Sequence, residues 1–144
     1  MSEVEIAHEL VHSYVKEIGL TKDQTFNAER NAWYWFKGSA KIEVFIQTVK
    51  VGEGHERHYL RVFSPIVKVP KTAIIAFYRK LLELNDTSLG VKLSIMAGSD
   101  QVYATFERDI KGMDYTELAD IIADVEWWAD HFDDMLIQEF GCEK

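Results

Sequence analysis

The sequence predicts an α+β fold in which helices pack on a five-stranded antiparallel sheet. Long amphipathic helices are indicated near both ends of the 144-residue chain, and five strand-like runs lie between them. Short turns that contain glycine separate most of these runs, and strands joined in this way pair antiparallel, because parallel strands need a long crossover. The expected order of elements is α-β-β-β-α-β-β-α. The length predicts one domain over residues 1–144.

The first helix is expected over Glu3–Ile18, where apolar residues recur in steps of three and four and Gly19 follows. Leu20–Arg30 is a polar connector of undefined structure. Strands are expected where apolar residues alternate with others or occupy both faces of a short run between turn residues. The five runs are Asn31–Phe36, Lys41–Val49, His58–Val67, Val91–Met96 and Gln101–Glu107.

The segment Pro70–Asp86 predicts a helix with two apolar sides. One side holds Ile74, Phe77, Leu81 and Leu84, and the other holds Ile75, Tyr78 and Leu82. A helix that packs on a sheet and is otherwise exposed to solvent needs only one apolar side. The second side is therefore covered by another helix or by a second copy of the chain. We expect Ile75, Tyr78 and Leu82 to form the interface of a homodimer.

The last helix is expected to begin after Asp114 and to run to about Phe140. Asp114 is the predicted N-cap, Glu117 completes a capping box, and Gly141 ends the helix. Its apolar residues are spaced alternately three and four residues apart without a break, which is the most regular periodicity in the chain. These residues are Tyr115, Leu118, Ile122, Val125, Ala129, Phe132 and Leu136.

The net charge of −8 is concentrated in the last segment. Residues 114–144 hold ten of the 24 acidic residues and only one of the 16 basic residues. This distribution argues against nucleic acid and anionic membranes as partners, because both need a basic surface. No apolar run approaches the roughly 20 residues that span a bilayer, and the first residues lack the basic start of a signal peptide. With Cys142 as the single cysteine, we expect a cytoplasmic protein.

Trp127 shares one face of the last helix with carboxylates, namely Asp120, Asp124, Asp130 and Asp134. Like charges four residues apart cost a few tenths of a kcal/mol in a helix, so fold stability alone does not account for them. Solubility is one explanation. The indole either caps an edge of the core or anchors a partner. Our hypothesis is that this face docks a basic or amphipathic segment of a protein partner.

The segment His8-Glu9-Leu10-Val11-His12 matches the HExxH motif of zinc hydrolases, in which two histidines bind zinc and the glutamate activates water. The extended form of the motif requires histidine where Ile18 stands, and both histidines flank the core stripe. The side chains of residues 130–134 spread over several helix faces. We predict no metal, no cofactor and no catalytic residue; a zinc hydrolase remains the alternative.

A second alternative is a sensor of small ligands with an aromatic pocket around Trp33 and Trp35. These two residues lie in a short run with large aromatic side chains on both faces, Trp33–Phe36. Such a strand is either central in the sheet or covered by another chain.

Several segments of the chain resemble YbjN-type domains, which are grouped with the chaperones of type III secretion as one α+β fold. The matching segments are Ser64-Pro65, Val69-Pro70, Leu81-Leu82-Glu83-Leu84-Asn85 and Phe140-Gly141. The resemblance covers roughly residues 44–141. It implies a twisted antiparallel sheet with helices packed on it, often a dimer, and a role in signalling or secretion support without a known reaction. We therefore expect a non-enzymatic protein-binding module, adaptor or chaperone-like.

Overall fold

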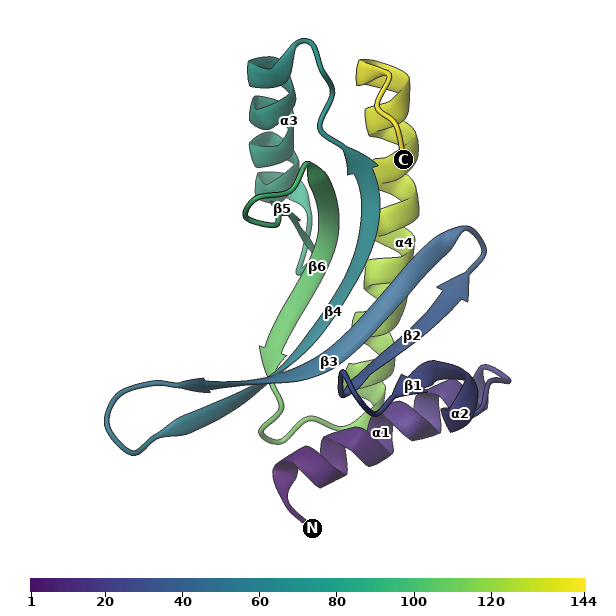
Figure 1. Cartoon of the computed structure of the whole chain (residues 1–144), viewed down its shortest axis with the longest axis vertical. Helices are drawn as coiled ribbons and strands as arrows, with labels where there is room; N and C mark the ends of the chain where they lie inside the picture. Colours follow the sequence, from purple (N-terminus) through teal and green to yellow (C-terminus); the bar gives the residue numbers. More distant parts are fainter.

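The computed structural model describes all 144 residues and shows a six-stranded antiparallel sheet with helices packed against it (Figure 1). The strands follow the order β1-β2-β3-β4-β6-β5, and every neighbouring pair is antiparallel, as predicted. The strands are β1 (Phe26–Asn27), β2 (Ala32–Lys37), β3 (Ala40–Lys50), β4 (Glu56–Lys68), β5 (Lys92–Ile95) and β6 (Gln101–Asp109). The helices are α1 (Glu3–Glu17), α2 (Lys22–Thr25), α3 (Ile74–Thr87) and α4 (Tyr115–Phe140).

The expectation of five strands is wrong by one, because the connector after α1 is structured. Thr21 caps α2: its hydroxyl accepts from the Gln24 N–H at 3.2 Å, and the Gln24 side chain accepts from the Thr21 N–H at 2.9 Å. The chain then enters β1, where Phe26 lies opposite Trp33 of β2. A strand of two residues carries no alternation, so a sequence pattern cannot indicate it.

Helix α3 begins at Ile74, four residues later than the predicted start at Pro70. The N-cap residue is Ala73, which has a left-handed backbone with φ 55°, and no side chain caps the helix. Alanine disfavours this conformation by roughly 1–2 kcal/mol, so neither propensity nor a cap pattern marks the start. The structure of the loop from Pro70 therefore determines where the helix begins.

The caps predicted for the last helix are confirmed. The Glu117 N–H donates to the Asp114 carboxylate at 2.8 Å, and the Asp114 N–H donates to the Glu117 carboxylate at 3.2 Å. Gly141 ends α4 with φ 64°. The predicted apolar stripe is buried apart from Tyr115, which is half-buried.

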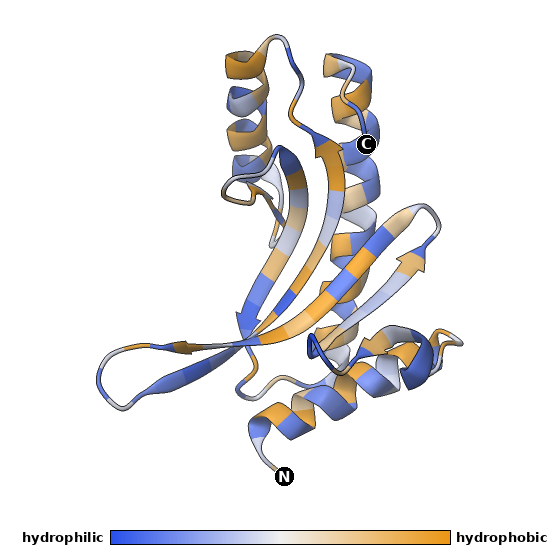
Figure 2. Cartoon of the chain, viewed as in Figure 1, coloured by the Kyte–Doolittle hydropathy of each residue, from blue (hydrophilic) through white to orange (hydrophobic).

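In Figure 1 helix α4 passes behind the β2–β3 hairpin and runs beside β4; it contacts β3, β4 and β6. Helix α1 packs against the N-terminal half of α4 (Figure 1), where the Tyr14 hydroxyl donates to Glu126 at 3.1 Å and the Tyr115 hydroxyl donates to Glu17. Helix α3 packs near the other end, with the Phe77 and Phe140 rings edge to face at 5.2 Å. Figure 2 shows hydrophobic and hydrophilic bands alternating along α1, α3 and α4. No helix is both long and apolar enough to cross a membrane.

The sheet face opposite α4 carries a row of half-buried aromatic rings. Phe63 lies edge to face against Phe45 at 5.5 Å and against Tyr103 at 5.4 Å. The Arg61 guanidinium lies over the rings of Phe45 and Phe63 and pairs with Glu107 at 3.2 Å. These contacts stabilise the outer face without a covering helix.

Candidate partner-binding surfaces

Trp127 is exposed on the acidic face of α4, with 59% of its surface accessible. Its indole stacks on the His131 ring at 5.0 Å with an angle of 13° between the planes, and it meets Trp128 at right angles at 4.8 Å. Trp128 in turn stacks on the buried Phe132. More than half of the indole surface is thus exposed, and its ring contacts are with His131 and Trp128 of the same helix.

The four carboxylates predicted to accompany Trp127 are exposed on the same helix. Only Asp130 lines the same open hollow as Trp127, which has a volume of about 630 Å³ and is bounded on its other side by Tyr14 and Lys37. Asp120, Asp124 and Asp134 lie outside this lining. Partial burial and the neighbouring charge of Asp120 raise the pKa of the Asp124 carboxyl. That this face binds a partner stays a prediction.

The second apolar side of α3 is uncovered in the single chain. Ile75 is 85% exposed, Leu82 is 70% exposed and Tyr78 is 44% exposed, whereas Phe77 and Leu81 on the first side are buried. On the first side Leu84 is buried as well, but Ile74, at the start of the helix, is 40% exposed. Three large apolar side chains along one exposed helix face form a patch of the kind found at protein interfaces. The homodimer itself stays a prediction.

The two histidines of the HExxH match pack into an aromatic cluster. The Trp33 indole N–H donates to His12 Nδ1 at 3.1 Å, and both imidazoles lie against the rings of Trp33 and Phe26. His8 Nε2 is buried without a partner. Nowhere in the chain do three or more histidine, cysteine or acidic side chains converge as metal ligands. The zinc-hydrolase alternative therefore lacks a third ligand, and the absence of metal stays a prediction.

Burial of the two imidazoles predicts that the fold loses stability in mild acid. Burial, reinforced by the charge of Lys22, lowers the pKa of His8 and of His12 below the ordinary value of 6.5. Because the unfolded chain therefore binds protons at a higher pH than the folded chain, the contribution of the two histidines to stability is fully present above about pH 6.5. It is lost as the pH falls through their pKa values in the folded state.

Urea unfolding at about pH 7.5 and about pH 5 measures this loss. We expect the double variant His8→Gln/His12→Gln to reduce the difference in unfolding free energy between the two pH values. We expect His55→Gln, at an exposed loop position, to leave that difference unchanged. The raised pKa values of the Asp124 and Glu126 carboxyls act in the opposite direction and are common to all variants. An equal loss in the double variant contradicts the assignment to these histidines.

Trp33 and Trp35 are core residues, with 0% and 5% of their surfaces exposed. Trp33 packs against the two histidines, and Trp35 packs against Tyr14 at 5.8 Å. Neither residue lines any of the five main hollows of the molecule. The structure therefore offers no observation in favour of an aromatic ligand pocket around them.

One polar cluster was missed at the sequence level. Asp133 is only 7% exposed and pairs with Lys144 at 2.8 Å. Helical spacing could have indicated its burial, because Asp133 follows Ala129 by four residues and precedes Leu136 by three, and both belong to the buried stripe. A carboxylate beside such a stripe indicates a paired or functional charge.

Comparison with known proteins places the chain by its fold. No protein-family model matches the sequence. No curated protein matches it either.

Two of the similar solved structures are complexes. A chain of the crystal structure of the ExsC–ExsE complex superposes with a TM-score of 0.70 at 13% identity, over 94% of this chain and 97% of that one. A chain of the HopA1–SchA chaperone–effector complex superposes with a TM-score of 0.64 at 10% identity, over 89% of this chain and 93% of that one. These similarities show the fold alone: the chain shares the α+β fold of these two structures, with six strands in place of the five expected.

Proposed function

We propose that this protein is a non-enzymatic protein-binding module, a chaperone or adaptor that works as a homodimer in the cytoplasm and docks a segment of its partner on the acidic face of α4. The observation that carries the proposal is Trp127, which is 59% exposed and stacks on His131. Exposed tryptophans are frequent anchors at protein interfaces.

Two further features support a protein partner. The surrounding carboxylates, Asp120, Asp124, Asp130 and Asp134, steer a basic or amphipathic segment toward the indole. One structure of similar fold is described as a chaperone–effector complex, and the other is also a complex. The sequence resemblance to YbjN-type domains adds roles in sensory regulation or secretion support, which stay predictions.

Capture of partners from the native host tests the proposal. We expect Trp127→Ala to weaken capture by about 30-fold, the equivalent of a 2 kcal/mol hot spot. We expect Asp120→Asn/Asp124→Asn to weaken it most at low salt, because salt screens exposed charges.

The control is Met96→Ala, which removes an exposed apolar side chain at the β5–β6 turn, outside α4. If both α4 variants fold normally and capture the same partners as the parent at every salt concentration, this face is only solvated and the proposal is wrong.

A further inference from the structure

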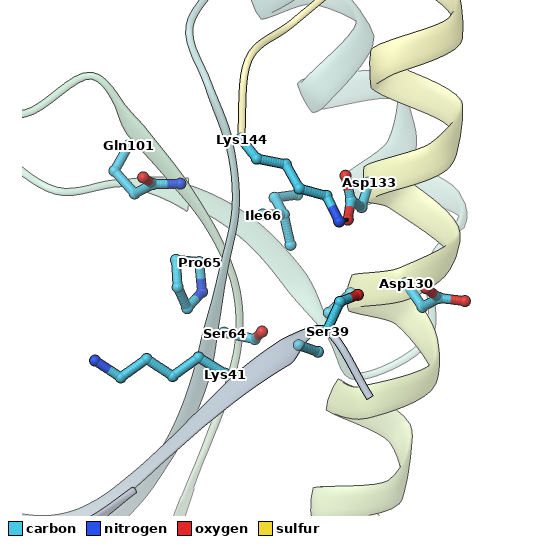
Figure 3. Close-up of a pocket in the computed structure, with 11 residues that line it drawn as sticks. Ser39, Lys41, Ser64, Pro65, Ile66, Gln101, Asp130, Asp133 and Lys144 are labelled. Carbon is cyan, nitrogen blue, oxygen red and sulfur yellow. Dashed lines mark ion pairs between the residues drawn. The ribbon is translucent and has the colours of Figure 1, made fainter. Parts of the chain in front are cut away.

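A second hollow, of about 220 Å³, lies where the β2–β3 turn, β4, the start of β6 and α4 meet (Figure 3). It adjoins the hollow at Trp127, because Ser39, Ala40 and Asp130 line both. Trp127 and Asp130 are one helical turn apart. A partner segment seated on Trp127 therefore has a direct path into this second hollow.

Two buried polar groups in its lining have no partner. Asp133 is 7% exposed, and its Oδ1 atom accepts no hydrogen bond. The Ser64 hydroxyl is wholly buried, and it also has no partner. A buried polar group without a hydrogen bond is costly, and a buried carboxylate more so. Two unpaired acceptors therefore lie beside the hollow, each without accessible surface in this conformation.

One cation of the chain itself occupies part of the site. The Lys144 ammonium contacts Asp133 Oδ2 at 2.8 Å, and Figure 3 shows it directed at that carboxylate. The hydrogen bond to Asp133 and the charges of Asp134 and Asp130 raise the pKa of Lys144. Asp130, the other carboxylate in the lining, forms no ion pair, and the second ammonium there, Lys41, is directed away from both carboxylates in Figure 3.

The Lys144 side chain can leave Asp133 easily, because it is 53% exposed, whereas the side chain of Asp133 is 10% exposed. The backbone beside it is held independently, because the Glu143 carbonyl accepts from the Lys68 N–H at 2.7 Å and Cys142 is buried. The ammonium can thus leave Asp133 without unfolding the segment that carries it.

We propose that this hollow binds a basic side chain of the partner segment, an arginine guanidinium or a lysine ammonium, which displaces Lys144 from Asp133. This inference rests on the proposed function and adds the chemistry of one partner residue. Arginine fits better than lysine, because its planar group carries five donors and can bind both oxygens of a carboxylate together. Lys144 acts as an internal competitor that keeps the buried carboxylate paired while no partner is bound.

The test uses three small probes with the full chain: Nα-acetyl-arginine amide, Nα-acetyl-lysine amide and the uncharged isostere Nα-acetyl-citrulline amide. Amide NMR shifts at residues 39, 64, 130 and 133 report binding. We expect the arginine probe to bind tightest and the citrulline probe to leave the shifts unchanged.

Two variants assign the site. Asp133→Asn keeps the shape of the side chain, and we expect it to weaken arginine binding about tenfold, the usual effect of losing a charge-assisted hydrogen bond. We expect Lys144→Met to strengthen binding by roughly threefold to tenfold, because it removes the competitor. Asp86→Asn makes the same charge change at an exposed position of α3 and is the matched control.

Equal binding of the citrulline probe, equal binding to the Asp133→Asn variant, or no binding to the Lys144→Met variant overturns the inference. The proposed function is judged separately by partner capture through Trp127. Capture that depends on Trp127 but is unaffected by Asp133→Asn contradicts only the inference that the second hollow binds a basic side chain. Probe binding without any captured protein supports the hollow as a cation site and counts against the proposed function.

Discussion

Leu82→Asp is expected to convert a dimer into a monomer. Leu82 is 70% exposed in the single chain and lies in the patch with Ile75 and Tyr78. In a two-fold symmetric dimer each substitution acts twice, so loss of about 2 kcal/mol of apolar burial per chain weakens association by roughly 1,000-fold. The introduced carboxylate adds a desolvation cost in the same direction.

Light scattering coupled to size-exclusion chromatography at tens of micromolar protein, a concentration range suited to dimers of micromolar affinity, measures this change. Val51→Asp is the control, because it places the same charge on an exposed apolar position in the β3–β4 loop. We expect it to leave the dimer intact. A parent protein that is monomeric at high micromolar concentration, or a Leu82→Asp protein that remains dimeric, contradicts the assignment of this face.

Trp33→Ala is expected to cost about 3–5 kcal/mol of unfolding free energy, a large part of the roughly 5–15 kcal/mol typical of a domain. Trp33 is wholly buried and fills the space between α1, β1 and β2. Its removal also leaves His12 Nδ1 without its donor. Trp33→Phe keeps most of the ring volume and is expected to lose less.

Urea unfolding compares these variants with Trp127→Ala, whose exposed indole is expected to contribute within about 0.5 kcal/mol. The pair distinguishes a core tryptophan from a surface one. A Trp33→Ala protein as stable as the parent contradicts the core assignment. A Trp127→Ala protein as unstable as Trp33→Ala shows that Trp127 is a structural lid, which removes the main support for the docking face.

Local chemistry determined the parts of this fold that the sequence predicted correctly. Helix α4 has an unbroken apolar stripe and a cap at each end, so its limits and buried side follow from nearby residues alone. The two sides of α3 follow from helical spacing in the same way. The hairpins predicted from glycine turns pair antiparallel. The acidic face with its exposed tryptophan also follows from spacing, because no residue outside α4 is needed to place it.

Tertiary structure alone decided the features that depend on residues far apart in the chain. β1 exists because Phe26 meets Trp33, and α3 starts at Ile74 because the loop before it is bent at Ala73. The second hollow needs Ser64, Asp133 and Lys144, which come from a strand, a helix and the segment after that helix. Periodicity reports which side of an element is buried, but not which distant group it meets there. Packing of the elements in three dimensions makes that choice, and with it the pairing of a buried carboxylate.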